Sequence, residues 1–356
     1  MNEEFYIKRT LRLAERAHGM TSPNPMVGAI IVKKGVIISE DFHRSPGTPH
    51  AEALVIEKAG QKALRSTLYV NLEPCCHTDK RTPPCTNAIT GAGIKKVVIA
   101  MKDPNPKVSG KGIIELQKAG IEVICGILED QAKKLNEAYI KYVTTGKPFV
   151  ILKAAMTLDG KIATPEGQSK WITGEKARRL VHRIRSRVDA VMTAIGTVKA
   201  DDPQLTARIR GGKNPIRIVI DPNLEVPRGA NVLRIPPETI IVAGVKNSKA
   251  FRLEQSGIKV IYYQEKLNLN RLMQKLGEME ITSLLIEGGS SLNAHAFEDG
   301  IVDKIMFFVA PIIIGGKESL PAIGGKTFKR LEEAHRIKDI RIKRIGEDFL
   351  IEGYIK

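Results

Sequence analysis

The sequence is poor in aromatic residues and in long apolar runs. Phe, Trp and Tyr together make up 5% of its 356 residues, and Trp occurs once. Proteins that hold single-stranded nucleic acid stack the bases on aromatic rings, so this composition argues against such a role. No uninterrupted apolar run approaches the length of about 18 residues that a membrane-spanning helix needs. We therefore expect no membrane span and no nucleic-acid partner.

Cysteine is also scarce, with four residues in the chain. Cys75, Cys76 and Cys85 are close in sequence, which favours metal binding over a framework of disulfides. Cys125 belongs to an apolar, strand-like run and is expected in a core. The first four residues are polar and acidic, without the basic start and apolar centre of a secretory signal. These observations predict a cytoplasmic protein.

The formal net charge is +17, from 56 basic and 39 acidic residues. Such an excess can serve a nucleic acid or a phosphorylated small molecule. Because charges of both signs are interspersed along the chain, the alternatives to a nucleic-acid partner are pockets for phosphorylated small molecules and a surface rich in Lys and Glu. A chain of 356 residues exceeds the usual size of one domain, so two domains are expected.

Strand-like runs alternate with helical patterns, which predicts an α/β fold in both halves. In the first half, strands are expected at 27–32, 36–39, 67–72, 96–100 and 121–125, and helices at 4–18, 112–118 and 131–143. In the second half, strands are expected at 149–155, 190–195, 216–221, 240–243, 259–263, 283–287 and 305–310, with an antiparallel edge at 337–344 and 348–355. Residues 144–148 contain Gly and Pro, which end helices. We expect domains over 1–145 and 146–356.

His50-Ala51-Glu52, followed by Pro74-Cys75-Cys76 and Cys85, is a pattern typical of a hydrolytic zinc site. Catalytic zinc takes three protein ligands and keeps one position for water, and it lowers the pKa of that water toward about 7. A glutamate two residues after the histidine moves protons, as in the zinc deaminases of nucleobases. We expect His50, Cys75 and Cys85 as ligands and Glu52 as the proton carrier. Cys75 is favoured because the residue after Pro74 is expected to begin a helix, and Cys76 remains the alternative.

The second half contains a possible anion site. Residues 286–292, IEGGSSL, predict a strand, two glycines and the start of a helix, where backbone N–H groups can face a phosphate. The dinucleotide fingerprint G-x-G-x-x-G is absent. Further polar clusters occur at 153, 159–161, 169–171 and 201–203. These residues by themselves predict an α/β domain with an anion site and no more.

The whole chain resembles the bifunctional bacterial deaminase–reductase family of riboflavin biosynthesis. In the first half the resemblance is carried by residues 22–28 (SPNPMVG), 50–52 (HAE), 72–75 (LEPC) and 81–85 (RTPPC). In the second half it is carried by residues 157–161 (TLDGK), 169–173 (SKWIT), 200–208 (ADDPQLTAR) and 286–289 (IEGG). It implies a cytidine-deaminase-like domain followed by a dihydrofolate-reductase-like domain. It also implies Zn²⁺ and NADPH as cofactors, and association of copies through the reductase half.

The resemblance implies two consecutive reactions. The first half would hydrolyse the 2-amino group of 2,5-diamino-6-(5-phosphoribosylamino)pyrimidin-4(3H)-one and release ammonia. The second half would reduce the ribosyl group and give 5-amino-6-(5-phosphoribitylamino)uracil. The implied catalytic residues are Glu52 and Lys153. The implied substrate contacts are Asn24, His43, His77, Arg81, Thr82, Ser169, Arg185, Leu205, Arg208 and Glu287, and the implied cofactor contacts are Ala155, Trp171, Thr197, Asp201, Pro222, Gly289, Ser290 and Ser291.

The chain departs from the family pattern P-C-S-H-x-G-[RK]-T-P-P-C in residues 74–85, which lack the Gly and contain one extra residue. The spacing of Cys76 to Cys85 matches the family spacing, so Cys76 stays open as a ligand. Pro222 stands where the family often has a hydroxyl residue, which leaves a backbone carbonyl for the cofactor. Two other hypotheses are a nucleic-acid-editing zinc deaminase with a basic accessory domain, and a structural zinc protein with His77 as fourth ligand. The editing enzymes space their cysteines as P-C-x-x-C, unlike this chain.

Overall fold

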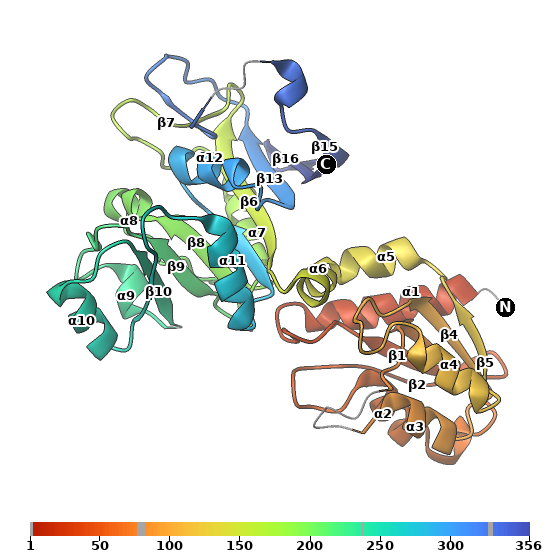
Figure 1. The fold of residues 1–356 in the computed structure, drawn as a ribbon. Helices are drawn as coiled ribbons and strands as arrows, with labels where there is room; N and C mark the ends of the chain where they lie inside the picture. Colours follow the sequence, from red (N-terminus) through yellow and green to blue (C-terminus); the bar gives the residue numbers. More distant parts are fainter. Residues whose placement is uncertain (1–2, 77–82, 237, 327–329) are drawn as a thin grey trace. The chain divides into compact units, whose positions relative to one another are not determined.

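The computed structural model describes residues 3–76, 83–236, 238–326 and 330–356. The chain divides into two compact units, Met1–Gly146 and Lys147–Lys356 (Figure 1). The division follows helix α6 (Glu137–Thr145), which ends where Gly146 adopts a left-handed φ of +70°. Gly accepts this conformation without a steric penalty. None of the helices within the described ranges is long and apolar enough to cross a membrane.

In the described part of the first unit, five strands form one sheet in the order β2-β1-β3-β4-β5. The strands are β1 (Gly28–Lys33), β2 (Val36–Phe42), β3 (Thr67–Leu72), β4 (Lys96–Met101) and β5 (Glu122–Cys125). β1 pairs antiparallel with β2 and β3, whereas β3, β4 and β5 run parallel. Lys34 and Gly35 join β1 to β2 with positive φ angles, as tight hairpin turns require.

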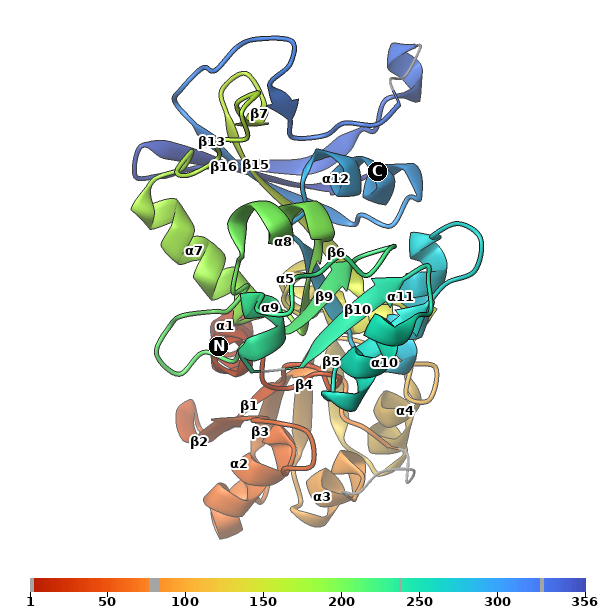
Figure 2. The same cartoon turned by 90° about the vertical axis from the view of Figure 1, so that its left-hand side faces the viewer.

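Helices cover both faces of this sheet (Figures 1 and 2). The helices are α1 (Glu3–Ala14), α2 (Ala51–Ala59), α3 (Cys85–Gly91), α4 (Lys111–Lys118), α5 (Glu129–Leu135) and α6, with the 3-10 turns η1 (Glu15–Ala17) and η2 (Gly60–Ala63). α1 packs on β1 and β3 beside α5, whereas α2 packs on β1 and β2 and is followed on its face by α3 and α4. The core of this unit is mostly aliphatic.

The expected strands are confirmed in both halves, with small shifts at their ends. Three local expectations are wrong. Cys75 does not begin a helix but lies in a segment without regular secondary structure after β3, and helix α3 begins at Cys85. The expected helix 131–143 is two helices, because Asn136 leaves the helix and bonds its side chain to the N–H and the carbonyl of Met26. Cys125 is exposed, since β5 is the edge strand of the sheet.

In the described residues of the second unit, nine strands form a sheet in the order β11-β10-β9-β8-β12-β6-β13-β16-β15. The strands are β6 (Phe149–Thr157), β8 (Ala190–Ala194), β9 (Ile216–Ile220), β10 (Thr239–Ala243), β11 (Lys259–Tyr262), β12 (Ser283–Ile286), β13 (Lys304–Ala310), β15 (Ile337–Ile345) and β16 (Asp348–Ile355). The strands from β11 to β13 are parallel, and β16 and β15 add an antiparallel edge, as expected. A separate short ladder pairs β7 (Lys161–Ala163) with β14 (Leu320–Pro321).

The helices of this unit also form two layers. They are α7 (Glu175–Arg185), α8 (Ile195–Asp201), α9 (Asn231–Arg234), α10 (Ser248–Gln255), α11 (Leu269–Glu278) and α12 (Ser290–Glu298), with the turn η3 (Leu331–Glu333). α11 and α12 contribute to the core on one face of the sheet, and α7 to α10 to the core on the other. β12 lies between β8 and β6 although it follows β11 in the chain. This reversal of strand order is where α/β sheets bind ligands, at the carboxyl ends of the strands.

Candidate metal centre and reductase site

One ring nitrogen and two sulfurs meet in the first unit. The ligand atoms of His50, Cys75 and Cys85 all lie within 4.8 Å of one another. Nδ1 of His50 is 3.2 Å from Sγ of Cys85 and 3.6 Å from Sγ of Cys75. Cys76, although described, is not in this group. The donor set fits catalytic zinc, which takes imidazole and thiolate ligands and keeps a fourth position for water.

Different elements bring the three side chains together. His50 precedes the first residue of α2, and Cys85 is the first residue of α3. Cys75 follows the carboxyl end of β3, and its carbonyl accepts a hydrogen bond of 3.3 Å from the N–H of Thr86. That bond ties the segment carrying one sulfur directly to the helix carrying the other.

The buried carboxylate of Glu73 holds the segment before Cys75 in place. Glu73 accepts hydrogen bonds from the N–H groups of Asp103 at 3.1 Å, Gly110 at 2.9 Å and Ile113 at 3.2 Å. Gly112 packs so closely that a Cβ there would lie 2.2 Å from the carbonyl oxygen of Pro74. Together these contacts hold α4 and the loop before it against the segment that carries Cys75.

Glu52 lies in the first turn of α2 and is 3% exposed. It lines the same cavity as His50 and Cys75, of about 50 Å³. Burial raises the pKa of its carboxyl, and the charge of His50 offsets this in part. A carboxyl whose pKa is shifted toward neutrality suits a group that must both accept and release a proton.

Asn24 and His43 lie together in this cavity. Nδ1 of His43 is 3.2 Å from the carbonyl oxygen of Pro49, and Nε2 is 3.2 Å from the amide nitrogen of Asn24. Because a carbonyl only accepts, Nδ1 must carry the proton in the neutral ring, and Nε2 then accepts from the Asn24 amide. The ring thereby fixes the orientation of the amide.

Asp103 and Tyr139 also line the cavity, and the sequence analysis missed both. The Tyr139 hydroxyl is 3.0 Å and 3.2 Å from the two oxygens of Asp103. Burial raises the pKa of Tyr139, and the charge of Asp103 adds to this effect, so the phenol stays a donor. Asp103 follows β4 closely, and a carboxylate after a strand was the available clue. His77, Arg81 and Thr82 lie outside the described residues.

In the second unit, Lys153 of β6, Arg185 of α7 and Glu287 after β12 form a buried charged cluster. Arg185 pairs with both oxygens of Glu287, through Nε at 2.6 Å and Nη2 at 3.0 Å. Nζ of Lys153 is 3.5 Å from Oε2 of Glu287. Burial favours the neutral form of Glu287, but the two cations outweigh it and lower its pKa to about 2. Burial lowers the pKa of Lys153, the charge of Glu287 offsets this in part, and the charge of Arg185 acts in the same direction as burial.

Leu205 and Arg208 lie in the segment after α8, and both have left-handed φ angles. Leu205 is buried and Arg208 is exposed. Burial and the charge of Arg185 both lower the pKa of Arg208. Ser169 lies in the loop before Trp171, and Trp171 is 70% exposed.

Several of the expected cofactor residues lie at or just after the carboxyl ends of strands. Ala155 lies on β6, Thr197 on α8, Gly289 before α12, and Pro222 after β9. A Cβ on Gly289 would lie 3.7 Å from Oγ1 of Thr197, so the starts of α8 and α12 are adjacent. Ser290 and Ser291 open α12, and Asp201 ends α8 and pairs with Lys170 at 3.2 Å. The Pro222 carbonyl already accepts from the N–H of Gly244 at 2.9 Å.

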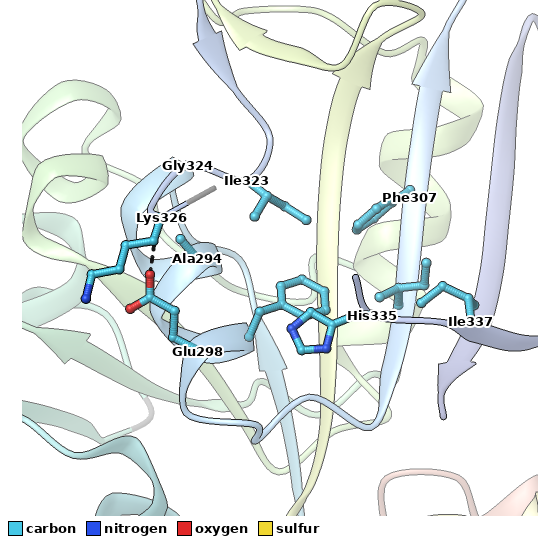
Figure 3. Close-up of a pocket in the computed structure, with 10 residues that line it drawn as sticks. Ala294, Glu298, Phe307, Ile323, Gly324, Lys326, His335 and Ile337 are labelled. Atoms are coloured by element: carbon cyan, nitrogen blue, oxygen red, sulfur yellow. Dashed lines mark hydrogen bonds between the residues drawn. The ribbon is translucent and has the colours of Figure 1, made fainter. Parts of the chain in front are cut away.

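A larger pocket, of about 700 Å³, lies elsewhere on the second unit (Figure 3). Its wall combines α12, β13, the loop at 323–326 and residues near β15, and is mostly apolar: Ala294, Phe297, Glu298, Ile305, Phe307, Ile323, Gly324, Lys326, His335 and Ile337. Lys153 pairs in register with Met306 and its Nζ lies 6.0 Å from the centre of the Phe308 ring. Since neighbouring residues of a strand point to opposite faces, Ile305 and Phe307 face away from Lys153. This pocket is therefore separate from the charged cluster.

Two family models match the chain. The model of the cytidine and deoxycytidylate deaminase zinc-binding region matches residues 1–101, and that of the RibD C-terminal domain matches residues 148–351. The riboflavin biosynthesis protein RibD of Aquifex aeolicus is 44% identical over 351 residues, with 98% of this chain and 97% of that protein covered. The same-named protein of Escherichia coli is 37% identical over 365 residues, with 98% of each covered.

Two solved structures are similar over nearly their full length. RibD of Acinetobacter baumannii superimposes with a TM-score of 0.92 at 36% identity, with 99% of each chain covered. A diaminohydroxyphosphoribosylaminopyrimidine deaminase/5-amino-6-(5-phosphoribosylamino)uracil reductase of Thermotoga maritima superimposes with a TM-score of 0.89 at 37% identity, again with 99% of each covered. These matches favour the two-step enzyme over a nucleic-acid editor. The chain belongs to the RibD family of riboflavin biosynthesis enzymes, which join a zinc-dependent pyrimidine deaminase to an NADPH-dependent reductase.

Proposed function

We propose that His50, Cys75 and Cys85 hold the zinc ion and that Glu52 moves the proton of the deamination. The observation that carries this assignment is the group of one imidazole and two sulfurs within 4.8 Å, beside a carboxylate that is 3% exposed. Zinc supplies the activation of water at neutral pH. Water adds to the ring carbon that bears the 2-amino group, Glu52 takes a proton from it, and the same carboxyl passes the proton to the departing nitrogen. Ammonia leaves, and the ring carbon keeps the oxygen.

We propose that the remaining cavity residues bind the pyrimidine. Asn24, with its amide oriented by His43, would hydrogen-bond the ring. Asp103 is buried and would accept from a ring N–H or an amino group, with Tyr139 keeping its carboxylate in place. The contacts expected from His77, Arg81 and Thr82, including a phosphate contact of Arg81, stay predictions.

We propose that the second unit reduces the sugar at the charged cluster. Conversion of ribosyl to ribityl breaks the bond between C1′ and the ring oxygen. A hydride adds to C1′, and a proton adds to the ring oxygen, which stays on C4′ as a hydroxyl. NADPH supplies the hydride. Lys153, whose pKa burial lowers, is the candidate donor of the proton. Glu287 would hold sugar hydroxyls, and Ser169 and Leu205 would line the same site.

The phosphate of the substrate needs a cation in the reductase site. Nε and Nη2 of Arg185 already donate hydrogen bonds to the Glu287 carboxylate, at 2.6 Å and 3.0 Å. Arg208 is exposed, and the repulsion from Arg185 would fall if an anion lay between them. We therefore favour Arg208 as the phosphate ligand and Arg185 as the residue that orients Glu287.

NADPH is proposed to lie along the carboxyl ends of the strands. Gly289, Ser290 and Ser291 would face its phosphates at the start of α12, with Thr197 beside them. Ala155, Trp171, Asp201 and the carbonyl of Pro222 complete the proposed contacts. We also propose that copies associate through the second unit, where the pocket beside α12 offers apolar surface, that no nucleic acid is bound, and that the enzyme works in the cytoplasm.

Two variants test the separation of the sites. Glu52→Ala should abolish ammonia release while NADPH oxidation on the deaminated substrate continues. Lys153→Met should do the reverse. Loss of both activities in either folded variant would contradict the assignment of one reaction to each unit.

A further inference from the structure

Trp171 is held in an unusual position for a tryptophan. It is the single Trp of the chain and is 70% exposed, although Trp is normally largely buried. It lies in the loop before α7, and the guanidinium carbon of Arg178, from the first turns of α7, is 4.6 Å from the centre of its ring. Guanidinium groups stack on aromatic faces in this way.

Contacts on both sides of Trp171 hold the segment around it in place. Lys170 bonds to the Asp201 carboxylate at 3.2 Å. Arg178 donates through Nη1 to the carbonyl of Thr173 at 2.5 Å, and the N–H of Gly174 donates to Asp348 at 2.8 Å. Arg178 therefore contacts both the ring of Trp171 and the backbone carbonyl of Thr173.

This arrangement leaves the ring ready for a flat partner. The guanidinium of Arg178 occupies one face, and most of the side chain remains in contact with water. Flat rings gain from offset stacking on an aromatic face. A ring already ordered by Arg178 loses less rotamer freedom when a partner binds, and this preorganisation strengthens binding.

We infer that Arg178 is a positioning residue for the cofactor: it holds Trp171 so that the ring can stack against a planar ring of NADPH. The inference rests on the proposed contact of Trp171 with NADPH. Arg178 acts through the indole and does not itself need to touch the cofactor. The competing possibility is that the guanidinium binds a cofactor phosphate directly.

A double-mutant cycle separates these possibilities. The dissociation constant of NADPH would be measured by calorimetry for the full-length wild type, Arg178→Ala, Trp171→Ala and the double variant. Arg178→Ala should weaken NADPH binding by about two- to fivefold, the value of an exposed cation–π contact. In the Trp171→Ala background the same substitution should have no further effect. Arg179→Ala is the matched control, since Arg179 is on the same helix but pairs with Glu175 at the surface.

Equal loss from Arg178→Ala with and without Trp171 would overturn the inference in favour of a direct contact. Normal NADPH binding by Arg178→Ala, with weak binding by Trp171→Ala, would overturn the inference but leave the proposed site intact. Normal binding by Trp171→Ala would show that the proposed cofactor contact itself is wrong. An unchanged urea-unfolding transition of the second unit verifies that each variant is folded.

Fluorescence of the single Trp gives an independent readout. In the absence of NADPH, Arg178→Ala should shift the emission of Trp171 and increase its collisional quenching by acrylamide, because the guanidinium no longer covers one face. Arg178→Lys should fall between the wild type and the alanine variant, since an ammonium keeps the charge but not the planar stacking. Unchanged emission and quenching in Arg178→Ala would contradict the positioning role.

Discussion

At the scale of single residues, Glu287 balances the charges of the reductase site. It is the carboxylate that faces both Lys153 and Arg185. Replacing it by Gln leaves two buried cations without their counter-charge, and removal of one partner from a buried pair costs about 3–5 kcal/mol. We expect Glu287→Gln to lower the free energy of unfolding of the second unit by that amount, measured by urea denaturation. Glu278→Gln, which removes an exposed pair with Lys275, should cost less than about 1 kcal/mol.

The same carboxylate predicts a pH dependence. The pKa of Glu287 in the folded state is about 2, below the ordinary value of about 4.3. Its contribution to the stability of the fold is therefore complete at pH values above about 4.3. The stabilisation is lost as the pH falls from about 4.3 toward 2. The acid denaturation curve of Glu287→Gln should therefore be flatter than that of the wild type in this window. Parallel curves would contradict the shift.

Tyr139 offers a prediction for the deaminase site. Tyr139→Phe removes the hydroxyl that donates to both oxygens of Asp103, and a hydrogen bond to a charged group is worth about 1.5–3 kcal/mol. We expect a loss of that size in the stability of the first unit and a raised KM for deamination, measured by ammonia release. Zinc content should stay at the wild-type value, since Tyr139 is not in the group of ligand atoms. A loss of zinc would show that the tyrosine supports the metal centre instead.

The residues of the metal group could be predicted because short sequence motifs identify metal ligands of this kind. His50, Cys75 and Cys85 come together as the H-x-E and P-C patterns imply. Asp103 and Tyr139 could not be found in this way, since they are 36 residues apart and meet only in the folded unit. The sequence favours Cys75 over Cys76 as a ligand, and in the structure Cys75, not Cys76, belongs to the group of ligand atoms.

At the scale of elements, the contact between α4 and the Cys75 segment predicts the effect of a single methyl group. A Cβ on Gly112 would lie 2.2 Å from the Pro74 carbonyl, so Gly112→Ala must displace the segment that carries Cys75. We expect reduced zinc content by elemental analysis and slower ammonia release, with NADPH oxidation on the deaminated substrate unchanged. Gly91→Ala is the control, since a Cβ there meets nothing within 4 Å. Full zinc occupancy in Gly112→Ala would contradict this account of the segment.

Strands were predicted better than helix ends. Buried strands such as β3 and β12 are short apolar runs between turns, and their positions follow from the local pattern of apolar residues. The break at Asn136 depends on its bonds to Met26, 110 residues earlier in the chain. The helix propensity of neighbouring residues cannot predict a contact between residues so far apart in the sequence. The irregular segment at Cys75 likewise has distant partners, because the Glu73 carboxylate two residues earlier accepts hydrogen bonds from α4 and from the loop before it.

At the scale of the whole molecule, two compact units each contain one set of reactive groups. The metal group and Glu52 belong to the first unit, and Lys153, Arg185 and Glu287 belong to the second. Alternation of strands and helices predicted the α/β class of both halves, whereas the strand order, with β12 between β8 and β6, came from the structure. That order decides which loops can meet at the proposed cofactor site.

The central claim is that a zinc site in the first unit deaminates the substrate without a nicotinamide cofactor, and that reduction follows in the second unit. Mass spectrometry of the products formed from 2,5-diamino-6-(5-phosphoribosylamino)pyrimidin-4(3H)-one, with and without NADPH, tests it most directly. We predict that the reaction without NADPH stops at a product in which oxygen has replaced the 2-amino group and the ribosyl group is intact. With NADPH, that product should gain two hydrogens. A reduced product that still carries the 2-amino group, or no deamination until NADPH is added, would contradict the account.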